Sequence, residues 1–164
     1  MAGSNNDPPL FSAVRANNIV ECRRLIDTGE ANINEDRDQI GGTALHLASI
    51  RCYLEISELL TSSGADVNIR RSADGWTAVY VASFCGQLEI VKLLLCQGAD
   101  MNIRDNNGIS ALKRASSYDD LKEVADCLRK WPWTMAIIAL QEIDTYKYLD
   151  FSSIEDLWHY LGNQ

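Results

Sequence analysis

The stretch DGWTAVYVASFCGQLEIVKLLLCQGADMN (residues 74–102) decides the fold, because much of it occurs a second time earlier in the chain. The segment GGTALHLAS (41–49) matches its first part, and GADVNIR (64–70) matches GADMNIR (98–104) at a shift of 34 residues. Thr43 and Thr77 are also 34 residues apart, and Ser110 follows 33 residues later in NGISALKRAS (107–116). Self-similarity at a fixed period of about 20–50 residues indicates an array of structural repeats.

Each copy predicts two consecutive helices. A hydroxyl residue precedes a short run rich in small residues, and its oxygen can cap the first free N–H groups of a helix. A glycine ends this first helix, as at Gly86, and a second helix follows with apolar residues at helical spacing, such as Ile90 and Leu93. Another glycine ends the second helix, at Gly64 and Gly98. One such pair cannot bury its apolar face alone, so stacked copies would form a helical solenoid.

The chain resembles ankyrin repeats in its period, in the run TALHLA (43–48), in GQLEIVKLLL (86–95) and in the two GAD-x-N segments. The resemblance covers about residues 8–130, as four repeats over 8–37, 38–71, 72–104 and 105–130, with the first and last the least regular. It implies an all-α ankyrin-repeat solenoid with hairpin-like loops. Tyr80 and Lys113 depart from it, because they stand where His46 stands in the second copy, and Lys113 cannot accept that histidine's hydrogen bonds.

Residues 131–164 depart from the repeat pattern. Pro132 is expected to break the helical pattern. A helix is expected over about 134–148 and a second from Ser152 or Ser153, where Ser152 and Glu155 match a capping box. We expect this pair to cover the apolar end of the fourth repeat. The alternative is a segment that recruits a second protein, such as a ubiquitin-ligase component, which would make the chain an adaptor.

Composition and charge narrow the class of protein. The 164 residues are 46% hydrophobic and 23% charged, as in soluble globular chains. A net charge of −8 disfavours general binding to nucleic acids or anionic membranes, because their phosphates repel it. The N-terminus has no basic start or apolar run, and the longest uncharged apolar run, MAIIAL, is too short to span a bilayer. We therefore expect a cytoplasmic or nuclear protein with reduced cysteines.

No motif in the sequence predicts catalysis, a cofactor or a metal site. His46 and His159 have no Cys or His set with zinc-ligand spacing near them. The five cysteines contain no CxxC pair, and most are expected to be buried small hydrophobic residues, with Cys52 and Cys85 more exposed. Glycine-rich phosphate loops are also absent from the sequence. The protein is therefore expected not to be an enzyme; an enzyme or regulatory subunit with an unrecognised site is the alternative.

The resemblance to ankyrin repeats implies contacts to a partner protein from hairpin tips and from the concave side of the first helices. Carried onto this chain, the tip residues are Gln39, Ile40, Gly42, Ala73, Asp74, Trp76, Asn106, Asn107 and Ile109, and the helix residues are Ile50, Arg51, Phe84, Cys85, Ser117 and Tyr118. Trp76, Tyr80 and Phe84 follow one another at a helical spacing of four residues, but their positions in the repeat predict different environments for them. We expect Tyr80 to point into the stack, with Trp76 and Phe84 exposed or half exposed.

A basic column is also predicted, from three arginines that each lie six residues before the hydroxyl residue of a repeat: Arg37, Arg71 and Arg104. Equal positions of a repeat stack in a solenoid. With the apolar groups, this column would grip a protein or peptide that carries hydrophobic and acidic residues, since aromatic residues and arginine often dominate interface energies. The alternative is that the arginines only pair with the neighbouring carboxylates of Asp36, Asp38 and Asp105.

Overall fold

The structure is a computed structural model that describes residues 7–141. These residues form eight α-helices and one short 3₁₀ helix, with no β-strand in the described range. The helices are α1 (Pro9–Arg15), α2 (Ile19–Asp27), α3 (Ala44–Arg51), α4 (Leu54–Ser62), α5 (Ala78–Phe84), α6 (Leu88–Cys96), α7 (Ala111–Ala115), η1 (Asp119–Leu121) and α8 (Lys122–Gln141). The chain divides into two compact units, Met1–Ala125 and Asp126–Gln164.

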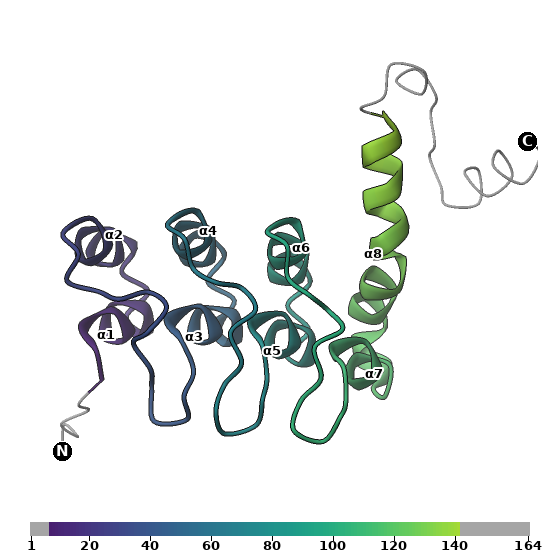
Figure 1. Cartoon of the computed structure of the whole chain (residues 1–164), viewed down its shortest axis with the longest axis horizontal. Coiled ribbons are helices and arrows are strands. Elements are labelled where there is room, and N and C mark those ends of the chain that lie inside the picture. The colour runs from purple at the N-terminus through teal and green to yellow at the C-terminus, as the bar shows by residue number, and fades with distance from the viewer. Residues whose placement is uncertain (1–6, 142–164) are drawn as a thin grey trace, which may run out of the picture. The chain divides into compact units, whose positions relative to one another are not determined.

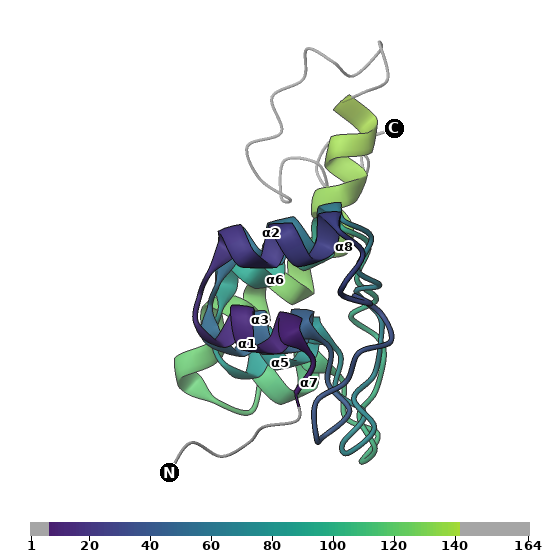
Figure 2. The same ribbon diagram turned by 90° about the vertical axis from the view of Figure 1, so that its left-hand side faces the viewer.

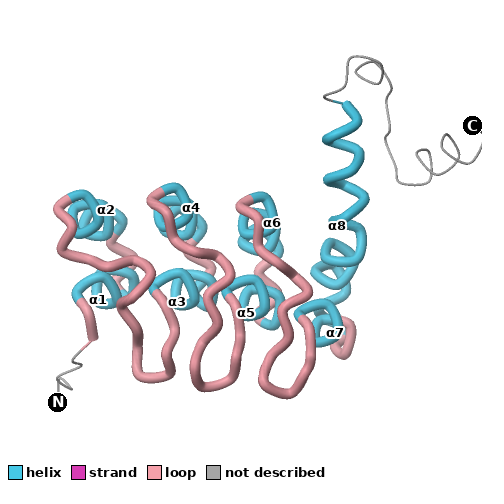
Figure 3. Tube along the Cα trace, viewed as in Figure 1, coloured by secondary structure: helices cyan, strands magenta, loops and turns pink. Residues whose placement is uncertain are grey.

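The first unit has two layers of helices (Figure 1). Helices α1, α3, α5 and α7 lie side by side in the inner layer, and α2, α4 and α6 lie side by side in the outer layer. Each outer helix packs on the inner helix that precedes it in the chain. The loops that connect successive pairs extend past the inner layer as hairpin-like tips (Figures 2 and 3). This arrangement confirms the all-α solenoid that the sequence predicts.

The core lies between the two layers and between successive pairs. Its largest fully buried side chains include Leu10, Phe11, Leu25, Leu45, Ile56, Leu60, Ile90 and Leu94. On the inner helices, Ala44, Ala48, Ala78 and Ala82 are buried as well. Small side chains on these helices allow neighbouring inner helices to pack closely, and the burial of aliphatic side chains stabilises the stack.

The helix boundaries follow the signals in the sequence. The hydroxyl of Thr77 accepts a hydrogen bond from the N–H of Tyr80, and the hydroxyl of Ser110 accepts one from the N–H of Lys113, both at 3.3 Å. At the other end of the inner helices, a residue in the left-handed conformation follows α1, α3 and α5: Asn17 (φ 51°), Cys52 (φ 58°) and Gly86 (φ 71°). The helices therefore begin and end as predicted, although only one of these three left-handed positions is a glycine.

Two asparagine side chains connect neighbouring repeats behind the tips. Asn34 donates to the carbonyl oxygen of Gly64 (2.9 Å) and accepts from the N–H of Asp66 (2.8 Å). Asn68 makes the same pair of contacts one repeat later, with the carbonyl of Gly98 (3.4 Å) and the N–H of Asp100 (2.8 Å). Each amide thus satisfies backbone groups at the end of the next outer helix.

The expected break at Pro132 is wrong, because α8 continues through this residue. A proline removes its own N–H from the helix ladder, but the hydrogen bonds before and after it can sustain the helix. The predicted boundary between residues 130 and 131 therefore falls inside α8. Most of the predicted C-terminal helix pair falls on residues 142–164, outside the described range, so its extent and its role as a cap stay predictions.

Candidate binding surface

Three aromatic side chains from two neighbouring repeats form a continuous row, which we call the aromatic row: Trp76, Phe84 and Tyr118. Trp76 precedes α5 and Phe84 ends it, and their ring centroids are 5.2 Å apart. Tyr118 follows α7 and meets Phe84 edge to face, at 6.1 Å. Phe84 is 39% exposed and Tyr118 is 44% exposed, while Trp76 is half buried. The row therefore offers a large aromatic surface of the kind that dominates many interfaces.

Tyr80 lies beneath this row and is 1% exposed, as the repeat frame predicts. Its ring centroid is 4.8 Å from that of Trp76. Its hydroxyl donates to Oδ2 of Asp105 and accepts from Nε of Arg114, both at 2.8 Å. Burial raises the pKa of Tyr80, so the hydroxyl remains protonated and able to donate at neutral pH. Tyr80 thus supports Trp76 from below and connects α5 to the fourth repeat.

Arg71 does not lie in an exposed basic column, and this part of the prediction is wrong. Arg71 is only 8% exposed. Its Nε donates to Oδ1 of Asp74 at 3.1 Å, its Nη2 pairs with Oδ2, and its Cζ lies 5.0 Å from the ring centroid of Trp76. Although burial opposes it, the hydrogen bonds from Arg71 and from the N–H of Trp76 lower the pKa of Asp74. Arg71 therefore fixes the second tip, between α4 and α5, and the first ring of the aromatic row.

Arg71 is buried because the hydrogen-bond register of its tip differs from that of the other two tips. The N–H of Asp38 donates to the carbonyl of Gly42, and that of Asp105 to the carbonyl of Ile109, each four residues ahead. The N–H of Arg71 donates to the carbonyl of Trp76, five residues ahead, at 2.9 Å. The second tip is thus one residue longer, and Arg71 takes the turn position that an aspartate holds in the other two tips.

The counterpart of Arg104 in the second tip is Arg70. Arg70 donates through Nε to the carbonyl of Gly75 (3.2 Å), and Arg104 donates through Nη1 to the carbonyl of Gly108 (2.9 Å). Arg37 is also exposed, and it donates to the carbonyl of Asp36. We call Arg37, Arg70 and Arg104 the tip arginines. Sequence reasoning missed Arg70, although the shared segment NIR at 68–70 and 102–104 aligns it with Arg104.

The tip arginines form no ion pair with any carboxylate in the described part of the chain. The alternative prediction is that Arg37, Arg71 and Arg104 pair with Asp36, Asp38 and Asp105. It is also wrong, because Arg37 and Arg104 have no ion pair among the described residues and Arg71 pairs with Asp74 instead. The carboxylate of Asp38 accepts N–H groups of its own tip, and Asp105 does the same while pairing with Arg114. Backbone donors occupy these carboxylates, so the tip arginines keep their charge free for other contacts.

The other residues of the predicted surface differ in exposure. Ile40 is 44% and Ile50 38% exposed, and the exposed residues also include Gln39, Arg51, Ala73, Cys85, Asn106, Asn107 and Ser117. Asp74 and Ile109 are half buried. Gly42 was expected at the surface of a tip but is buried, because its N–H points to the carboxylate of Asp38 inside the turn.

Charge is divided unequally between the two layers. The inner helices α1, α3, α5 and α7 contain four cationic residues and no acidic residue: Arg15, Arg51, Lys113 and Arg114. The outer helices contain five carboxylates and three cations: Glu21, Asp27, Glu55, Glu58 and Glu89 against Arg23, Arg24 and Lys92. The inner layer is therefore cationic in a chain whose net charge is −8.

The titratable groups near this surface are held in unreactive forms. Burial lowers the pKa of His46 to about 4, and its Nδ1 accepts the N–H of Thr43 while Nε2 contacts the carbonyl of Trp76 (3.0 Å). Partial desolvation raises the pKa of the Cys85 thiol at this surface, and burial raises that of Cys22, on α2 of the outer layer, to about 11, so both thiols are protonated at neutral pH. In residues 7–141 no cluster of His, Cys, Asp or Glu could hold a metal ion.

None of the helices described here has the length and apolar character needed to cross a membrane. A family model for ankyrin repeats, comprising three copies, matches residues 2–71, and a model for a single ankyrin repeat matches residues 74–106. The two matches together cover more than half of the chain, and the part after residue 106 has no family match. No curated protein matches the chain significantly.

Proposed function

Because the chain belongs to the ankyrin-repeat family, whose members are generally protein–protein interaction modules, we propose that it is a non-catalytic module that binds a partner through its inner layer and tips. The observation that carries this proposal is the aromatic row. Two of its rings are exposed by more than a third, and the three rings touch in sequence across two repeats. Such a surface would lose its contact with water when a partner covers it.

The partner we propose carries hydrophobic anchors and acidic residues. The hydrophobic anchors would pack on the aromatic row. The acidic residues would meet five cations of the inner layer and tips that have no ion pair within the described residues: Arg37, Arg51, Arg70, Arg104 and Lys113. Opposite charges across an interface speed association and exclude partners of the wrong sign.

Rigid display is the proposed mechanism. Arg71 and Asp74 hold Trp76 in the second tip, and Tyr80 supports its ring from inside the stack. A surface that is already in place loses little conformational entropy on binding. Binding therefore requires no rearrangement of the helices.

The experiment is a quantitative pull-down with the purified chain, comparing wild type with Phe84→Ala. We expect Phe84→Ala to lose the partners that wild type retains, because it interrupts the aromatic row. Val20→Ala is the matched control, since Val20 is a 76% exposed apolar residue of α2 in the outer layer. Circular dichroism would verify that both variants fold. Equal capture by Phe84→Ala and wild type would refute the proposed surface.

A further inference from the structure

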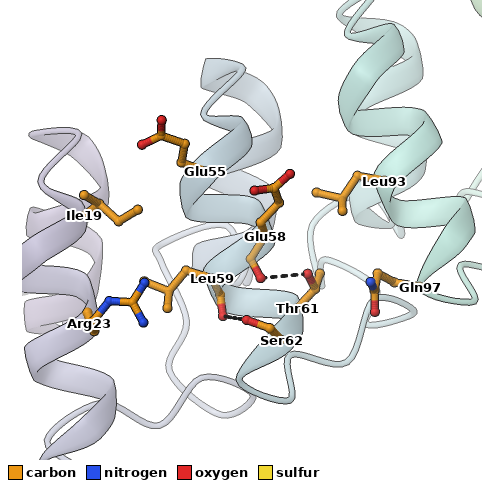
Figure 4. A pocket seen from close by; sticks show the side chains of 9 residues that line it. All are labelled: Ile19, Arg23, Glu55, Glu58, Leu59, Thr61, Ser62, Leu93 and Gln97. Atoms are coloured by element: carbon orange, nitrogen blue, oxygen red, sulfur yellow. Dashed lines mark hydrogen bonds between the residues drawn. The ribbon is translucent and has the colours of Figure 1, made fainter.

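The outer layer has a depression that the proposed function does not use. Its volume is about 510 Å³, and it lies over α4 between α2 and α6 (Figure 4). It therefore draws on three successive repeats, on the opposite layer from the aromatic row. We call it the outer groove.

Each of the three helices contributes one apolar side chain to the outer groove. Ile19 comes from α2, Leu59 from α4 and Leu93 from α6. Leu59 is buried, whereas Ile19 and Leu93 are half buried and keep part of their surface in contact with water. Aliphatic side chains of a bound segment could cover this surface.

Two carboxylates, Glu55 and Glu58, and one cation, Arg23, line the outer groove, so the acidic side chains are in excess. Glu55 and Glu58 are exposed on α4, a helix that contains no Lys or Arg, and neither forms an ion pair with a described residue. The neighbouring outer helices differ, because Arg24 pairs with Glu21 and Lys92 pairs with Glu89. Arg23 pairs with neither of the two carboxylates, so both are able to contact cations from another molecule.

The remaining polar side chains of the outer groove are Arg23, Thr61, Ser62 and Gln97, so Glu55 and Glu58 are the only charged acceptors among its lining residues. The hydroxyls of Thr61 and Ser62 donate to the carbonyls of Glu58 (3.1 Å) and Leu59 (3.0 Å) within α4 itself (Figure 4). Arg23 lines the groove from α2 and supplies a donor for a backbone carbonyl of a bound segment.

We propose that the outer groove binds a segment of another protein in which Lys or Arg residues flank aliphatic side chains. The cations of this segment contact Glu55 and Glu58, and its aliphatic groups cover Ile19, Leu59 and Leu93. A second copy of the chain is a poorer occupant, because two molecules of charge −8 repel each other. The inference does not depend on the inner layer, and it gives the chain a second binding face of opposite charge.

The test is an NMR titration of the full, ¹⁵N-labelled chain with two alanine-based peptides of equal length. Both peptides carry leucines at helical spacing, flanked by lysines in one and by glutamates in the other. We expect the lysine peptide to shift backbone amide signals of α2, α4 and α6 around the groove, and the glutamate peptide not to shift them. The double variant Glu55→Lys/Glu58→Lys should weaken binding of the lysine peptide by about tenfold or more.

Two further variants separate the groove from general charge attraction. Glu35→Lys/Glu123→Lys makes the same change in net charge at exposed residues that do not line the groove, and should weaken binding by less than about threefold. Leu93→Gln leaves the charge unchanged and should also weaken binding. Equal losses in the two double variants, or shifts confined to the inner layer, would overturn the proposal. The proposal would also be overturned if, without peptide, the same backbone amide signals shifted as the protein concentration rises, because a second copy of the chain would then occupy the groove.

Discussion

Arg70 and Arg104 make the same contact in consecutive hairpin tips, where each guanidinium donates to the carbonyl oxygen of its tip glycine, Gly75 or Gly108. Arg71, next to Arg70 in the chain, makes a different set of contacts. It is buried, pairs with Asp74 and lies against the ring of Trp76. Removal of Arg71 is therefore expected to lower the stability of the chain more than removal of Arg70.

Arg71→Ala is expected to lower the free energy of unfolding by about 1–3 kcal/mol, because it leaves the half-buried Asp74 without its cation and Trp76 without packing. Arg70→Ala should lower it by no more than about 0.5 kcal/mol, since the Arg70 side chain is exposed. Urea denaturation monitored by circular dichroism measures both values. Equal losses in the two variants would contradict the different roles assigned here.

His46 is expected to make stability depend on pH. Its pKa is about 4 in the folded chain against 6.5 as the unperturbed value, so below pH 6.5 the unfolded state binds more protons. The contribution of His46 to the free energy of unfolding is therefore fully present above pH 6.5. It falls as the pH drops towards 4, by up to about 3 kcal/mol. A protonated Nδ1 could no longer accept the N–H of Thr43, which is the local reason for the loss.

Urea midpoints of wild type and His46→Gln at pH 7.5 and pH 4.5 test this dependence. The glutamine variant should be the less stable at pH 7.5, because it loses the bonds of the imidazole to the backbone. The difference between the two proteins should shrink at pH 4.5, since only wild type loses the contribution of His46. A difference that stays constant over this range would show that His46 does not titrate as described.

Cys52→Gly is expected to stabilise the chain by about 0.5–1 kcal/mol. Cys52 has a φ of 58°, a conformation that costs a residue with a Cβ atom about 1 kcal/mol and costs glycine little. The equivalent position after α5 is already a glycine, Gly86. Cys85→Gly is the control, because Cys85 has a φ of −85° and should instead lose stability. Thermal unfolding under reducing conditions measures both changes, and stabilisation by both substitutions would point to the thiols instead of the backbone.

Asn34→Ala is expected to lower the free energy of unfolding by about 1 kcal/mol, because it leaves the carbonyl of Gly64 and the N–H of Asp66 without their partner. Asn102→Ala serves as the comparison, since the Asn102 side chain makes no hydrogen bond with a described residue and only its backbone N–H donates to Asp100. Its effect should stay below about 0.5 kcal/mol. Chemical denaturation of both variants decides whether the bridge between repeats stabilises the stack.

The sequence predicts the helices of the repeats well, because their boundaries depend on local chemistry, but it wrongly places a break at Pro132, inside α8. Thr77 and Ser110 supply oxygens to the free N–H groups that follow them, and Gly86 takes a backbone conformation that favours glycine. Stacking then brings Phe84 against Tyr118 of the next repeat, which lies one position beyond Ser117, the residue equivalent to Phe84. Local signals and periodicity are therefore sufficient for the fold and for the aromatic part of the surface.

The charged part of the surface was less predictable, because it depends on where a loop takes up an extra residue. Arg104 lies six residues before Ser110 and two residues after Asn102. In the preceding tip, the residue six before Thr77 is Arg71, whereas the residue two after Asn68 is Arg70. Only the hydrogen bonds of the turn show which count applies, since they place Arg71 at the position of Asp105. The outer groove had no signal in the sequence, because its residues are separated in the chain and converge only when three repeats stack.

The unequal division of charge between the layers also has a consequence at long range. Cations on the inner helices and carboxylates on the outer helices give the repeats an electric dipole moment in addition to the net charge. In the field of an approaching acidic molecule this dipole experiences a torque, which turns the cationic layer of the chain towards that molecule before any side chains touch. The chain would therefore select the orientation of an encounter at distances up to about 10 Å, and added salt would remove this guidance.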